Sequence, residues 1–87
     1  MLEVKKFSAS WCGPCKTLAP TFNEVKNSFS GVSFSEYDID DSSDVASQYG
    51  IRSVPTVLLV KDGKEVKRIV GAQSKSTYEG AINENLG

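Results

Sequence analysis

The sequence contains no histidine and only two cysteines, Cys12 and Cys15, among its 87 residues. A structural zinc site usually takes four cysteine or histidine ligands, so a single chain cannot close one with this pair. Two chains that shared their cysteine pairs would reach that number, and this arrangement stays open as an alternative. For a single chain we expect no metal site.

An excess of charge of either sign is also missing. Ten Lys and Arg residues stand against eleven Asp and Glu residues, for a net charge of -1. Nucleic-acid and anionic-membrane binders usually carry a basic patch, so we expect neither kind of partner. No apolar run approaches the roughly 20 residues of a membrane span, and the first residues hold no apolar segment like that of a secretory signal. We therefore expect a cytoplasmic location, where disulfides are usually transient or catalytic.

The length and the hydrophobic content of 39% predict one domain over residues 1–87 with a small core. The apolar patterning predicts strands over residues 2–9, 32–39, 56–60 and 65–70, and helices over 13–29 and 74–86. Between them, residues 40–43 offer N-caps for a short helix that runs through Tyr49. The order β-α-β-α-β-β-α predicts an α/β fold with one mixed four-stranded sheet and helices on both faces. Its first two strands should be parallel and its last two antiparallel.

Single residues refine the expected helix ends and turns. Pro20 lies inside the first helical pattern and should kink that helix. Gly50 is a typical C-terminal stop for the second helix, and Asp62-Gly63 predicts a hairpin between the last two strands.

The last helix can begin at either of two serines. Ser74 or Ser76 can serve as its N-cap, and Glu79 would complete a capping box on Ser76. The residues expected on the buried face of this helix are Tyr78, Ala81, Ile82 and Leu86.

The run Trp11-Cys12-Gly13-Pro14-Cys15 lies where the first strand meets the first helix. Gly13 and Pro14 form a short turn that lets the two sulfurs meet. Cys15 belongs to the apolar stripe of the helix, so it should point inward. Cys12 should lie at the helix N-terminus, where free N–H groups and the helix dipole favour a thiolate. We therefore predict that Cys12 is the nucleophile of a disulfide exchange and that Cys15 resolves the mixed disulfide.

At these residues the sequence resembles the thioredoxin family, and the resemblance extends over nearly the whole chain. The matching segments are Phe7 and residues 9–16, 19–20, 38–40, 49–52, 54–56, 61–63, 70–72 and 74–75. The resemblance implies a thioredoxin-like fold and a protein-disulfide reductase that acts as a monomeric electron carrier. Its redox-active group would be the Cys12-Cys15 disulfide, with no other cofactor. The implied partners are a thioredoxin reductase or equivalent donor and disulfide-containing proteins, ribonucleotide reductase among them.

The resemblance also implies a substrate-binding surface around the disulfide. Pro55 would follow a cis peptide bond and face the disulfide, and the backbone of Val54 would pair with a substrate strand. The remaining members of this surface would be Trp11, Gly13, Pro14, Gly71 and Ala72.

Two features depart from the family pattern. The sequence starts at the motif strand, without the family's usual opening strand and helix, so residues 32–39 should form a sheet edge. Lys6 stands where the family usually has a buried aspartate, and Glu36 stands where it often has a lysine. One hypothesis is that Lys6 and Glu36 form an ion pair behind the disulfide, and that Glu36 or neutral Lys6 accepts the Cys15 proton. The alternative is that both side chains are solvated.

Two other functions remain open on the sequence alone. A compact glutaredoxin-like protein would take electrons from glutathione, although Gly13-Pro14 differs from the Pro-Tyr that glutaredoxins typically carry there. A binding subunit of a larger enzyme would use the surface around Trp11, Val54 and Gly71 without needing its thiols.

Overall fold

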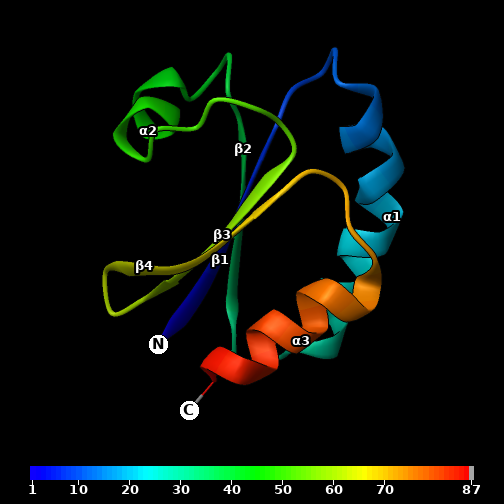
Figure 1. Cartoon of the computed structure of the whole chain (residues 1–87), viewed down its shortest axis with the longest axis vertical. Coiled ribbons are helices and arrows are strands. Elements are labelled where there is room, and N and C mark those ends of the chain that lie inside the picture. Colours follow the sequence, from blue (N-terminus) through cyan, green and yellow to red (C-terminus); the bar gives the residue numbers. More distant parts are fainter. Residues whose placement is uncertain (87) are drawn as a thin grey trace.

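The computed structural model describes residues 1–86 and contains seven elements in the predicted order (Figure 1). They are β1 (Leu2–Ser8), α1 (Gly13–Ser28), β2 (Ser33–Asp38), α2 (Ser43–Gln48), β3 (Thr56–Lys61), β4 (Lys64–Val70) and α3 (Lys75–Asn85). No helix in this described part is both long enough and apolar enough to cross a bilayer.

The four strands form one mixed sheet in the order β2-β1-β3-β4. β1 is parallel to β2 and antiparallel to β3, and β4 is antiparallel to β3. The predicted mixed sheet and α/β fold class are therefore confirmed. β1 lies inside the sheet, and β2 forms one edge and β4 the other.

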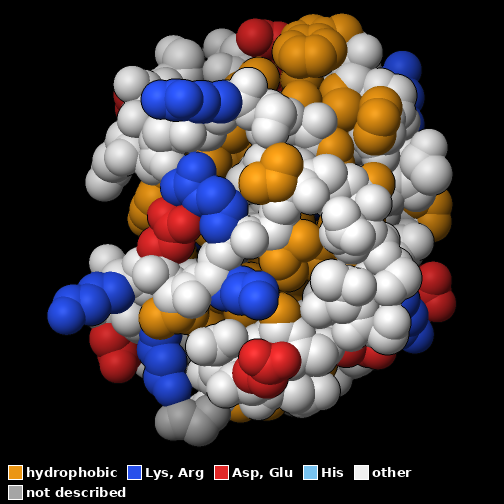
Figure 2. Space-filling view, viewed as in Figure 1, with side chains coloured by type: hydrophobic (Ala, Val, Ile, Leu, Met, Phe, Trp, Pro, Cys, Tyr) orange, Lys and Arg blue, Asp and Glu red, His pale blue; other side chains and the backbone are white. Residues whose placement is uncertain are grey.

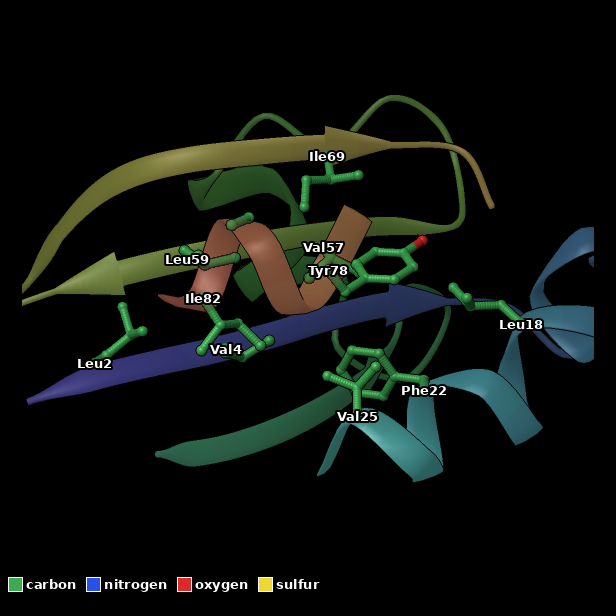
Figure 3. Close-up of a cluster of buried hydrophobic side chains, with 11 residues drawn as sticks. Leu2, Val4, Leu18, Phe22, Val25, Val57, Leu59, Ile69, Tyr78 and Ile82 are labelled. Atoms are coloured by element: carbon green, nitrogen blue, oxygen red, sulfur yellow. The ribbon is translucent and has the colours of Figure 1, made fainter. Parts of the chain in front are cut away.

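The helices lie in two layers, with α1 and α3 on one face of the sheet and α2 on the other (Figure 1). Figure 3 shows side chains of α1 and α3, such as Phe22 and Tyr78, packed toward Val4 and Val57 on the strands. A smaller apolar cluster on the opposite face joins Phe7, Leu58 and Val60 to Ala46 of α2. Helices therefore cover both faces of the sheet, and the carboxyl end of β1 lies between the two helical layers.

Pro20 does not interrupt α1, which runs continuously from Gly13 to Ser28. Proline removes one backbone N–H, so the carbonyl four residues earlier, at Lys16, loses its helical partner. Both residues are exposed, so that carbonyl can remain solvated. The face that carries Leu18 and Phe22 packs against the core and holds the helix in register.

The start of α3 settles the choice between the two serines in favour of Ser74, whose Oγ accepts a hydrogen bond from the Thr77 N–H at 3.3 Å. The predicted capping box between Ser76 and Glu79 is therefore wrong. The predicted burial of Leu86 is also wrong, because the helix ends at Asn85 and Leu86 remains 48% exposed. Tyr78, Ala81 and Ile82 are buried as predicted.

Candidate functional site

The cysteine motif lies at the carboxyl end of β1, next to the start of α1. The chain leaves β1 at Ser8, whose carbonyl accepts a hydrogen bond from the Ile39 N–H after β2. The Cys12 N–H then donates to the Ala9 carbonyl at 3.1 Å. These bonds fix the turn, so that Cys12 becomes the N-cap of α1 and Pro14 falls in its first turn.

A disulfide joins Cys12 and Cys15, whose Cα atoms lie 5.3 Å apart. The Cys15 N–H, one of the first-turn N–H groups that have no acceptor within the helix, donates to Cys12 Sγ at 3.1 Å. Hydrogen bonds of this kind stabilise sulfur more when it is a thiolate. The arrangement therefore favours negative charge on Cys12 once the disulfide is reduced.

The two cysteines differ little in exposure: Cys12 is 5% exposed and Cys15 is 6% exposed. Sequence reasoning expected Cys15 to be the shielded member of the pair. Cys12 is equally shielded because Val54 and Ile39 pack against the cluster that Ala9 forms with the two cysteines. The difference between the sulfurs therefore lies in their positions relative to the helix N-terminus rather than in burial.

The loop before β3 faces the disulfide. The Val54 carbonyl oxygen lies 3.7 Å from Cys12 Sγ, and the Val54–Pro55 peptide bond is cis. The Pro55 carbonyl accepts a hydrogen bond from the Gly71 N–H at 2.8 Å, which ties this loop to the end of β4. Val54, Pro55 and Gly71, which lie far from Cys12 in the sequence, are thus brought together on one side of the disulfide.

Trp11 projects beside the disulfide and is 65% exposed. Its Nε1–H donates to Asp40 Oδ2 at 2.9 Å. Figure 2 shows hydrophobic side chains gathered at the top of the view, over the connection from β1 to α1. Sequence reasoning did not single out Asp40 as the partner of Trp11, because that contact depends on how the end of β2 sits against the motif.

Lys6 and Glu36 form an ion pair across β1 and β2, with Lys6 Nζ 3.0 Å from Glu36 Oε1. The Lys6 side chain is buried, whereas Glu36 is partly exposed and also binds Lys26 at 3.1 Å. Burial by itself would raise the pKa of Glu36, but hydrogen bonds from Lys6 and Lys26 outweigh it and lower that pKa. The alternative in which both side chains are solvated therefore does not describe Lys6.

The Lys6 ammonium lies over the Phe22 ring, 4.8 Å from its centroid. Phe22 follows Cys15 by two helical turns, or about 10 Å along the axis of α1. The ion pair is therefore alongside the middle of α1, and the structure does not bring it into contact with the sulfurs.

Tyr78 contributes a polar group that its predicted place in the buried stripe did not reveal. Its hydroxyl donates to the Gly71 carbonyl at 3.2 Å and accepts from the Gln73 N–H at 3.1 Å. Burial raises the pKa of this phenol. Tyr78 thus holds the segment after β4, including the glycine that binds Pro55.

A redox-active cysteine pair at the start of a helix, on a mixed sheet with helices on both faces, defines a thiol–disulfide oxidoreductase. Within residues 1–86, no three or more Cys, Asp or Glu side chains are grouped as metal ligands would be. The Cys12–Cys15 disulfide is the group in this site that can exchange sulfur bonds with another disulfide.

The thioredoxin family model matches residues 2–84. Thioredoxin from Chlamydia caviae is 44% identical over 79 residues, covering 91% of this chain and 78% of that protein. The chloroplastic M-type thioredoxin of Zea mays is 42% identical and covers 94% of this chain, which spans only 50% of that protein. The crystal structure of thioredoxin NaTrxh from Nicotiana alata superposes with a TM-score of 0.91 at 44% identity, covering 95% of this chain and 71% of that one.

The chain belongs to the thioredoxin family, and its activity is that of a protein-disulfide reductase. The glutathione-dependent alternative is not favoured by these relatives.

Proposed function

We propose that Cys12 and Cys15 carry this activity in the following order. In the reduced protein, the Cys12 thiolate attacks one sulfur of a substrate disulfide and forms a mixed disulfide, and the other substrate sulfur leaves as a thiolate and takes a proton. Cys15 loses its proton and attacks Cys12 Sγ. The Cys12–Cys15 disulfide forms, the mixed disulfide breaks, and the second substrate thiolate is released. Two electrons pass to the substrate.

The observation that carries this order is the place of Cys12 at the N-cap of α1. Its sulfur accepts the Cys15 N–H, and this bond favours the thiolate at position 12. Cys15 lies three residues further along the chain, inside α1, so its sulfur is less favourably placed relative to the N–H groups at the helix N-terminus. We therefore assign the attack on the substrate to Cys12 and the resolving step to Cys15.

We propose that protein substrates bind along the loop that faces the disulfide. The Val54 backbone would pair with an extended substrate segment, next to cis Pro55. Exposed Trp11 supports this role because it offers apolar area beside the sulfurs. The further residues of this proposed surface are Gly13, Pro14, Gly71 and Ala72.

We also propose the setting in which the reaction runs. The chain would act as a monomer of one domain, take electrons from a thioredoxin reductase or equivalent donor, and pass them to protein disulfides. Ribonucleotide reductase is one candidate acceptor. A cytoplasmic location suits this work, since a dithiol donor is kept reduced where the surrounding thiol pool is reduced.

We propose Lys6 and Glu36 as the groups that receive the proton of Cys15. The pair lies along the α1 face that carries Cys15, and Lys6 is held there by Glu36. The lowered pKa of Glu36 keeps its carboxylate ionised at neutral pH and able to accept a proton, as a weak base. Because the Lys6 ammonium is about two turns of α1 from Cys15, the proton would reach the pair through bridging water rather than by direct contact.

An insulin-type disulfide reduction assay tests the proposed order. The parent should reduce insulin when a thioredoxin reductase supplies electrons, and more slowly with glutathione alone. Cys12→Ser should reduce the rate to background. Cys15→Ser should accumulate a mixed disulfide through Cys12, because the resolving thiol is gone.

The control is limited alkylation of the reduced parent at neutral pH, followed by mass mapping. Cys12 should be labelled before Cys15. Earlier labelling of Cys15 would contradict the assigned order. Full biological activity of a Cys12→Ser, Cys15→Ser double variant would instead support the binding-subunit alternative.

A further inference from the structure

Arg68, on edge strand β4, binds the backbone at the end of α2 with its guanidinium. Its Nη2 donates to the Tyr49 carbonyl at 2.5 Å, and its Nη1 donates to the Gly50 carbonyl at 3.4 Å. Glu65, three residues earlier on β4, holds the same guanidinium in two bonds of 2.8 Å each. Arg68 thus makes more contacts than an ordinary surface ion pair would give it.

The two carbonyls are available because of how α2 ends. Gly50 adopts a positive φ of 64°, which closes the helix in a Schellman motif. In that motif the Ile51 N–H donates to Ala46 and the Gly50 N–H donates to Ser47. Neither bond uses the carbonyl of Tyr49 or Gly50. Arg68 supplies donors to both of them.

These carbonyls begin the loop of residues 50–55, which leads to the disulfide. The other end of the loop is held by β4 as well, since the Gly71 N–H donates to the Pro55 carbonyl at 2.8 Å. Between the two attachments lies Val54, whose carbonyl oxygen is 3.7 Å from Cys12 Sγ. Edge strand β4 therefore holds both ends of the segment that faces the reactive sulfur.

We propose that Arg68, oriented by Glu65, is a positioning residue for protein substrates. It holds the start of loop 50–55 so that the Val54 backbone is already ordered when a substrate strand pairs with it. Ordering a binding segment in advance reduces the entropy lost on binding. This inference rests on the proposed docking at Val54. Arg68 does not touch the sulfurs, so it should affect substrate binding rather than the exchange step.

Steady-state reduction of a protein disulfide by Arg68→Met tests this role. KM should rise by about tenfold while kcat stays within about twofold of the parent, because an ordering effect on binding is removed. Arg68→Lys should recover part of the loss, because an ammonium can donate to one carbonyl but cannot bind both carbonyls and Glu65 at once as the planar guanidinium does. The matched control is Lys67→Met, which removes one positive charge from the exposed neighbour on β4 and should leave KM unchanged.

Hydrogen exchange at the Ile51 amide, which donates to the Ala46 carbonyl, tests whether Arg68 orders the start of the loop without an activity measurement. Exchange there should be about tenfold faster in Arg68→Met than in Lys67→Met, with exchange in β1 and α1 unchanged. Alkylation of Cys12 by a small reagent should keep the parental rate. If Arg68→Met does not fold, Glu65→Gln keeps Arg68 and should show the same changes to a smaller degree.

A KM for Arg68→Met equal to that of Lys67→Met would overturn the proposal. So would a raised KM with unchanged exchange in the loop, or faster exchange with an unchanged KM. Failure of the parent to reduce any protein disulfide would count against the proposed function instead. The exchange measurement would still report whether Arg68 orders the loop.

Discussion

Among individual side chains, Glu36 lies in a charged environment that affects both the stability of the protein and the proposed proton transfer. It contacts two ammonium groups, and one of them belongs to buried Lys6. A buried charge without its partner is costly, whereas a solvated one loses little. On the sequence, an ion pair between positions 6 and 36 was one of two alternatives suggested by the family resemblance, and the structure shows that the pair forms. The participation of Lys26 was not predicted, because it depends on where α1 lies over the edge of β2.

Glu36→Gln should lower the free energy of unfolding at neutral pH by about 1–2 kcal/mol, because Lys6 stays buried with a weaker partner. The pKa of Glu36 is lowered in the folded state, so its contribution is present above its ordinary value of 4.5 and is lost as the pH falls below it. The difference between parent and variant should therefore shrink in acid. Denaturant unfolding at a series of pH values measures it, with Lys26→Met as the control that leaves Lys6 paired.

The same variant also tests the proposed proton transfer. Glu36→Gln and Lys6→Met should each change the pH profile of disulfide reduction between about pH 6 and about pH 9, where thiols titrate. Profiles that match the parent in both variants would exclude this role. Lys67→Met is the control, because Lys67 lies on β4 at the opposite edge of the sheet, and it should keep the parental profile.

For the helices and strands, the sequence located most elements to within one or two residues, and the errors fall at ends. The core of α1 followed from its apolar stripe, and the end of α2 followed from Gly50. The start of α3 was ambiguous because Ser74 and Ser76 have similar capping ability. The choice was made by the segment that precedes the helix, where Ser74 has an extended backbone.

Two glycines in contrasting positions give a prediction for these elements. Gly80 is exposed within α3, and a Cβ there would meet nothing within 4 Å. Gly80→Ala should therefore raise the free energy of unfolding by about 0.5–1 kcal/mol. Gly50→Ala should instead lower it by about 1–2 kcal/mol, because position 50 needs a positive φ. Thermal or denaturant unfolding of both variants compares them, and a stabilised Gly50→Ala would contradict this account.

At the scale of the whole molecule, a series of hydrogen bonds joins the helical layer to the loop beside the site. Tyr78 belongs to the main core beside α1, yet its hydroxyl binds the backbone of Gly71 and Gln73. Gly71 in turn binds Pro55. One buried phenol thus links the helical layer to the loop that faces the disulfide.

Tyr78→Phe should lower the free energy of unfolding by about 1–3 kcal/mol, because the Gln73 N–H and the Gly71 carbonyl lose a shielded partner. Denaturant unfolding measures this cost. Tyr37→Phe is the matched control, since its hydroxyl has only a 3.4 Å contact from Lys5 in a partly buried position. Equal losses in the two variants would show that the bonds to residues 71 and 73 contribute little.

The order of the elements, the mixed sheet and the reactive role of the cysteine pair follow from the amino-acid sequence, because periodicity, turn residues and cysteine spacing act over short distances along the chain. Packing alone decided that Val54 covers Cys12, which is as buried as Cys15. It also decided that Asp40 contacts Trp11 and that Arg68 binds the end of α2. Each of these contacts joins residues at least 18 positions apart. Such pairs meet only when the strands and helices have taken their places, so no local pattern predicts them.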